Sequence, residues 1–111
     1  VVLFFTHLAL KSDIRKQQID ELRMLADRET GDVLIAGDFN ILAGLEELDV
    51  FTKDGRYELL NDSAHGTFTL FGKHYLLDIC LVSRHTTART SLQIIDQPFS
   101  DHDALLITVS K

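Results

Sequence analysis

Six polar residues of types that serve phosphate and metal chemistry are spread along the 111-residue chain: His7, Asp38, Asn40, Asp78, Asp101 and His102. Carboxylate oxygens suit hard cations such as Mg²⁺ or Mn²⁺, whereas zinc sites use more nitrogen and sulfur ligands. Such a set suits metal-assisted attack of water on a phosphate ester, with histidine carrying a proton or stabilising charge. The six residues therefore predict a site only if the fold brings them together.

Taken singly, most of these residues have an ordinary structural interpretation. Asp38 and Asn40 are residue types that form turns after a strand. His7 alternates with Leu3 and Phe5, which is the setting of a core histidine. Asp78 is different, because it lies in the apolar segment 77–82, and a buried carboxylate needs a charged or hydrogen-bonding partner.

The elements that must position these residues begin with a strand, a helix and a second strand. Residues 1–8 are apolar on both alternating faces, which predicts a strand buried on both sides. Residues 13–29 carry an apolar stripe at helical spacing, and residues 33–37 form a second apolar run. This order predicts a parallel pair of strands joined by a right-handed crossover.

The remaining elements are shorter. We expect a short helix over 45–51, a hairpin of strands 67–71 and 75–82, and strands over 91–95 and 104–109. The fold class is therefore α/β (α+β), with a mixed β-sheet and a covering helix. Only one helix is long enough to cover a sheet, so one sheet face is expected to lack cover.

These strand directions bring the polar residues to one edge of the sheet. The first two strands end at the same edge, next to His7, Asp38 and Asn40. If the strand 67–71 runs the same way, Asp78 falls at that edge as well. If 91–95 does so too, the following loop delivers Asp101 and His102. Ligand sites in open α/β sheets favour such edges.

Composition limits the class of protein. Seventeen acidic residues against 11 basic ones give a net charge of −6, which disfavours loose binding to nucleic acid or to an anionic membrane. The apolar runs are much shorter than the roughly 20 residues of a membrane-spanning helix. Cys80 is the only cysteine, so no intrachain disulfide forms, and a reducing compartment such as the cytoplasm is favoured.

Taken in order, six segments of the chain resemble the endonuclease/exonuclease/phosphatase superfamily, which has the deoxyribonuclease-I-like fold. The segments are Thr6-His7-Leu8, Arg15 with Gln18 and Leu22, Gly37-Asp38-Phe39-Asn40, Thr67-Phe68, Leu77-Asp78-Ile79 and Ser100-Asp101-His102. The resemblance implies half of a four-layer α/β/β/α sandwich. It also implies a Mg²⁺- or Mn²⁺-dependent hydrolase of ester bonds, of the nuclease or phosphatase type.

The resemblance also implies a role for each residue. Asp38 would orient or deprotonate the attacking water, and Asn40 would hydrogen-bond the phosphate or the nucleophile. Asp101 would bind the metal together with Asp38. His102 would contact the scissile phosphate, oriented by Asp78. The remaining residue, His7, would stabilise the phosphate or the leaving group.

One departure from the family pattern concerns its first half. Family members begin with a half that carries an early asparagine and the glutamate that is the principal metal ligand, and neither motif occurs in residues 1–111. We therefore expect the chain to be the C-terminal half of the domain. The absent half would supply the second sheet, and an N-terminal half or a second copy would cover the bare sheet face.

The substrate stays open among nucleic acid, phospholipid, inositol phosphate and tyrosyl-DNA adducts. The alternative to an enzyme is a catalytically incompetent half-domain that acts as an interaction or folding module.

Overall fold

A mixed four-stranded sheet is the central layer of the computed structural model, which describes residues 1–110. Its strand order is β1 (Val2–His7), β2 (Val33–Asp38), β6 (Asp78–Ser83) and β3 (Tyr57–Leu59). β1 and β2 are parallel, and the other two pairs are antiparallel. The predicted α/β class and the parallel first pair are confirmed.

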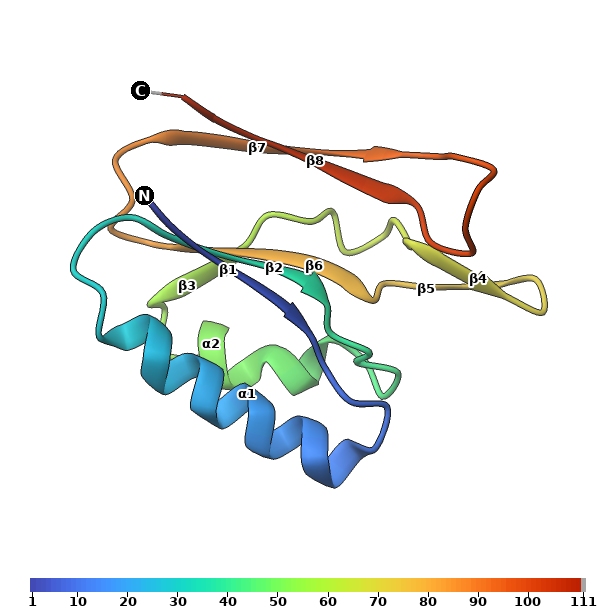
Figure 1. Cartoon of the computed structure of the whole chain (residues 1–111), viewed down its shortest axis with the longest axis horizontal. Coiled ribbons are helices and arrows are strands. Elements are labelled where there is room, and N and C mark those ends of the chain that lie inside the picture. The colour runs from blue at the N-terminus through green and yellow to red at the C-terminus, as the bar shows by residue number, and fades with distance from the viewer. Residues whose placement is uncertain (111) are drawn as a thin grey trace.

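The helices cover one face of this sheet (Figure 1). Helix α1 (Ser12–Asp27) is the crossover between β1 and β2 and buries Ile19, Leu22 and Ala26. The short helices η1 (Leu45–Leu48) and α2 (Asp49–Thr52) fill the same layer. Phe39 and Phe51 meet edge to face beneath the sheet, so the main core lies between the helices and the sheet.

A separate hairpin covers part of the opposite face (Figure 1). Strands β7 (Arg89–Ile95) and β8 (Ala104–Ser110) pair only with each other among the described residues. Leu92 and Ile107 of the hairpin pack against the second core cluster, formed by Leu34, Ala36, Cys80 and Val82. The expectation that β7 and β8 join the central sheet is therefore wrong. So is the expectation that all of the second sheet comes from elsewhere, because this hairpin forms a second β layer.

Strand β1 is the part of the sheet that the hairpin leaves open. The second core cluster draws its residues from β2 and β6 alone, and Phe5 of β1 is 77% exposed, with Val1 and Leu3 also exposed on the same face. The prediction of a strand buried on both sides is thus wrong for β1. In β2, by contrast, residues 33–36 are all buried, because β2 has a neighbour on each side and cover on both faces.

The predicted hairpin of 67–71 with 75–82 divides into two parts. β4 (Phe68–Leu70) and β5 (Lys73–Tyr75) form a two-stranded ribbon that projects from the molecule (Figure 1). The chain then enters the central sheet as β6. The turn between β4 and β5 consists of Phe71 and Gly72, which both have positive φ, as a tight two-residue turn requires. The edge strand β3, only three residues long, was not predicted.

Arg15 ties together the two segments that leave β1 and β2. Its guanidinium is buried and donates to both carboxylate oxygens of Glu47, at 2.6 and 3.1 Å. It also donates to the carbonyl oxygens of Ala9 and Leu10. The segment that follows β1 and the segment that follows β2 are therefore held together by one buried ion pair.

We predict that Glu47→Ala lowers the free energy of unfolding by about 3–5 kcal/mol, because it leaves the Arg15 cation buried without a charged partner. Urea denaturation of the variant and of the parent measures this difference. Glu46→Ala is the matched control, since Glu46 is the neighbouring glutamate and is exposed. Equal stability of the two variants would show that the Arg15 pair contributes nothing.

No helix among the described residues has the length and hydropathy to span a membrane.

Candidate active site

His7, Asp38 and Asp78 lie in one row across three neighbouring strands. The register pairs His7 of β1 with Asp38 of β2, and Asp38 with Asp78 of β6. β1 and β2 end at this edge, and the antiparallel β6 begins there, so three distant segments deliver a polar residue to one place. The structure places these residues as the strand directions predict.

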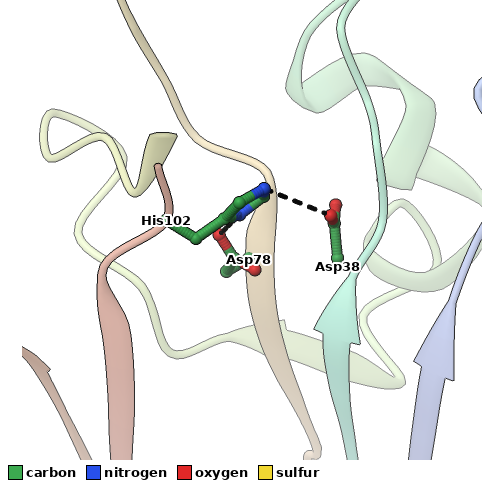
Figure 2. Close-up of side chains that lie close together, drawn as sticks. All are labelled: Asp38, Asp78 and His102. Atoms are coloured by element: carbon green, nitrogen blue, oxygen red, sulfur yellow. Dashed lines mark hydrogen bonds and ion pairs between the residues drawn. The ribbon is translucent and has the colours of Figure 1, made fainter. Parts of the chain in front are cut away.

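The loop between β7 and β8 adds His102 to this row. His102 forms an isolated bridge with Phe68 at the start of β4, and their rings are 4.7 Å apart between centroids. Its imidazole lies between two carboxylates, as Figure 2 shows: Nδ1 is 2.7 Å from Oδ2 of Asp78, and Nε2 is 3.6 Å from Oδ2 of Asp38. A carboxylate only accepts hydrogen bonds, so Nδ1 is the donor to Asp78, and Nε2 is directed at Asp38.

The charges around His102 favour its protonated form. Partial burial of the ring lowers the pKa of His102, but the hydrogen bond that the ring donates to Asp78 and the charges of Asp78, Asp38 and Asp101 act in the opposite direction. The net effect raises the pKa of His102 above its ordinary value. The imidazole is therefore biased towards a cation that donates from both nitrogens.

Asn40 fixes the backbone that follows β2. It adopts a positive φ of 49°, a conformation that asparagine tolerates better than most residues. Its backbone N–H donates to Oδ1 of Asp38 at 3.0 Å, and its side-chain Nδ2 donates to the carbonyl oxygen of Leu8 at 2.6 Å. Asn40 is buried, so it acts both as a turn residue and as a link between β1 and β2.

His7 and Asp101 lie at the rim of the site. The His7 imidazole is 77% exposed, with Nε2 3.6 Å from Oδ2 of Asp38, so the interpretation of His7 as a core histidine is wrong. The reason is that β1 is an edge strand whose second face is open. Asp101 is exposed, and it lies outside the close cluster of Asp38, Asp78 and His102, although its charge acts on His102.

The donor set fits a hard divalent cation. The nearest ligand-type atoms of Asp38, Asp78 and His102 lie within 4.8 Å of one another, but a protonated His102 donates from both nitrogens, so the carboxylates are the ligands on offer. The charges of Asp38, Asp78 and Asp101 all act on the one imidazole, which leaves negative charge that a cation would offset. Asp78 is engaged by His102, so Asp38 is the clustered carboxylate more available to a cation such as Mg²⁺, which keeps several waters and needs few protein ligands.

Sequence reasoning assigned no site role to Asn61 and Thr67, two buried polar residues beside Asp78. The side chain of Thr67 accepts hydrogen bonds from the backbone N–H groups of Leu77 and Asp78. No periodicity marks such residues, because their partners are backbone groups far along the chain. The signal for Thr67 was its place in the family-like segment Thr67-Phe68, to which no role was attached, and Asn61 carried no signal.

A model of the Endonuclease/Exonuclease/phosphatase family matches residues 3–102. The chain belongs to this family. No curated protein matches the sequence. Among solved structures, the family fold recurs in truncated TDP2 from Caenorhabditis elegans, with a TM-score of 0.69 and 17% identity. It recurs in a mannosyl-6-phosphatase from Bacteroides thetaiotaomicron, with a TM-score of 0.67 and 16% identity.

Both structural matches cover nearly all of this chain but only about half of the matched chain. The alignments cover 98% of this chain in each case, but 54% of the TDP2 chain and 51% of the phosphatase chain. The chain therefore spans about half the length of these solved structures. At such identities the likeness shows a deoxyribonuclease-I-like fold.

The raised pKa of His102 gives a testable pH dependence. A histidine whose pKa is raised on folding stabilises the protein below its unfolded pKa of about 6.5, and that stabilisation is lost as the pH rises through the folded pKa. We therefore expect the free energy of unfolding to fall from about pH 6 upwards. In Asp78→Asn we expect a smaller decline with pH. We also expect the free energy of unfolding at pH 6 to be lower by about 1.5–3 kcal/mol, because the charged hydrogen bond is lost.

Urea denaturation across this pH range in the presence of a chelator measures both effects. Asp20→Asn is the control, because Asp20 is exposed on α1. A pH profile of Asp78→Asn that overlays the parent would rule out the Asp78–His102 pair as its source.

Proposed function

We propose that this chain carries the acid–base and phosphate-binding residues of a divalent-metal-dependent phosphoesterase, which hydrolyses a phosphodiester or phosphomonoester with activated water. The observation that carries the proposal is the His102 imidazole held between Asp78 and Asp38 at one edge of the sheet. Membership of the family supports the same reaction class.

Asp38 is the residue that orients and deprotonates the attacking water. Its Oδ1 accepts the N–H of Asn40, which fixes the carboxylate so that Oδ2 is directed at His102 and His7, at 3.6 Å from each. A carboxylate fixed in this way accepts a proton without first reorganising. Asn40 keeps this turn in place through its bonds to Asp38 and Leu8, and the rest of its amide would hydrogen-bond the phosphate or the nucleophile.

His102 stabilises the phosphoryl group. Asp78 fixes the orientation of the ring and favours its cationic form, so Nε2 donates a hydrogen bond towards the space in front of Asp38. Negative charge that develops on phosphoryl oxygens during water attack is stabilised by such a preorganised donor. His7 lies on the other side of Asp38 and is exposed, where it faces the phosphate or the leaving group.

Asp38 and Asp101 are the residues that would hold Mg²⁺ or Mn²⁺. When bound, the cation neutralises phosphoryl charge and lowers the pKa of a bound water. The family resemblance implies a further glutamate ligand, which would come from outside residues 1–111. Without that ligand we expect the metal to be bound weakly.

We further propose that residues 1–111 are the C-terminal half of a larger domain. The chain spans about half of each solved structure that it resembles, and the exposed face of β1 carries Val1, Leu3 and Phe5. An N-terminal half-domain packed on this face would complete the site. The exposed face equally favours the alternative function, an interaction module that lacks activity by itself.

We predict that His102→Ala, within a complete domain, lowers metal-dependent turnover by about 10²–10³-fold, the usual loss when one electrostatic stabiliser is removed. Turnover is measured with bis-p-nitrophenyl phosphate and p-nitrophenyl phosphate in parallel. The two substrates separate diesterase from monoesterase activity. His85→Ala is the matched control, because His85 bonds the carbonyl oxygen of Gly31 far from the site. Turnover close to the parent level in His102→Ala would refute the proposed role.

The isolated chain is expected to self-associate through the face of β1 and to hydrolyse these substrates poorly. An exposed apolar patch of this kind is uncommon on a monomer. In sedimentation velocity, Phe5→Ser should shift the chain towards monomer, whereas Met24→Ser, which removes an exposed apolar residue from α1, should not. A monodisperse monomer with strong Mg²⁺-dependent hydrolysis would contradict both the half-domain and the weak metal site.

A further inference from the structure

The start of β6 lacks a neighbouring strand on one of its sides. β2 pairs with β6 as far as Asp78, but β3 on the other side reaches only from Ser83 to Leu81. The backbone groups of Asp78 that face away from β2 therefore have no strand partner. Buried backbone groups without partners are costly, so something else must bond them.

Two buried side chains take the place of the missing strand. Oγ1 of Thr67 accepts the N–H of Asp78 at 2.9 Å and the N–H of Leu77 at 3.1 Å. On the following peptide, Nδ2 of Asn61 donates to the carbonyl oxygen of Asp78 at 3.0 Å, and Oδ1 of Asn61 accepts the N–H of Cys80 at 2.8 Å. The backbone of Asp78 is thus bonded on both of its polar groups by side chains.

Thr67 is also bonded to the segment that carries His102. Its carbonyl oxygen accepts the N–H of Asp103 at 2.7 Å, and its own N–H donates to the carbonyl oxygen of Tyr75 at 2.9 Å. Thr67 itself is 0% exposed. One residue is therefore bonded to Asp78 and to the neighbour of His102, the two sides of the Asp78–His102 contact.

We propose that Thr67 and Asn61 are positioning residues, which set the distance between the carboxylate of Asp78 and the imidazole of His102. This inference rests on the proposed function, because it assigns to these residues the geometry of the proposed phosphate-binding group. The contact between Nδ1 and Oδ2 is 2.7 Å, and a displacement of about 1 Å would take it beyond hydrogen-bond range.

The chemistry of the hydroxyl makes the inference testable with near-isosteric changes. A threonine hydroxyl has two acceptor lone pairs, which matches its two N–H donors. Valine has the same shape but no acceptor, so Thr67→Val releases the N–H groups of Leu77 and Asp78. Thr67→Ser keeps the hydroxyl and should restore the parent behaviour. Asn61→Ala releases the carbonyl side of Asp78.

Ser83 offers a matched control for loss of a buried hydroxyl. Its Oγ accepts the backbone N–H of Val33 at 3.0 Å, and it lies at the far end of the same strand β6. Ser83→Ala therefore removes a buried acceptor from a backbone amide without touching the site edge. A merely structural effect on β6 would appear in Ser83→Ala as well as in Thr67→Val.

The experiment records the downfield proton resonance of the His102 Nδ1–H at low temperature in the full 111-residue chain. We expect this resonance in the parent, in Thr67→Ser and in Ser83→Ala, and its loss in Thr67→Val. If Thr67→Val does not fold, Asn61→Ala takes its place with the same expected loss. Metal-dependent turnover is measured in parallel in the complete domain, where Thr67→Val should lower kcat by about 10²-fold and Thr67→Ser should restore it.

Retention of the resonance in folded Thr67→Val and in Asn61→Ala would overturn the inference, and so would its absence from the parent chain. Equal loss in Ser83→Ala would also overturn it, because the effect would then belong to β6 in general. A parent domain without turnover would refute the proposed function alone, since the resonance reports the Asp78–His102 contact without any substrate.

Discussion

The register of β2 with its two neighbours is the constraint on which the site depends. β2 is parallel to β1 and antiparallel to β6, so its last residue, Asp38, lies beside the last residue of β1 and the first residue of β6. A slip of one residue in either pairing would turn a polar side chain to the other face of the sheet. The buried residues of β2 and β6 prevent such a slip, because both faces of these strands are packed. Core packing and site geometry are therefore set by the same contacts.

The electrostatics of the edge follow from this register. Placing Asp38 and Asp78 on paired positions brings two carboxylates close together in a partly buried place, where like charges repel. The His102 imidazole lies between them, with its two nitrogens directed at the two carboxylates. This arrangement offsets part of the repulsion and leaves a net negative site once Asp101 is included. Because the chain also has a net charge of −6, the proposed phosphate substrate would need the positive charge of the histidines and of a cation.

The sequence was sufficient to predict the parallel pair of β1 and β2, the crossover helix and the meeting of polar residues at one edge, because these follow from strand direction and local periodicity. It was not sufficient for β3, which is too short to carry a pattern, or for the separation of β7 and β8 from the central sheet. Alternation of apolar and polar residues is the same for a strand in a sheet and for a strand stacked upon it. The interpretation of His7 as a core histidine was wrong for a related reason, since residue type does not reveal that β1 is an edge strand.

The Asp78–His102 contact is independent of whatever covers the open face of β1. Its supports are Thr67, Asn61 and the bridge of Phe68 with His102, all within the described residues and all on the side of β6 away from β1. By contrast, the proposed metal ligands are the exposed residue Asp101 and Asp38. Under the proposed function, the Asp78–His102 pair would therefore be in place before any partner binds, while the affinity for a metal would depend on the ligands that a partner adds. The histidine pair and the proposed metal site would then be separable parts of one site, positioned by different segments of the fold.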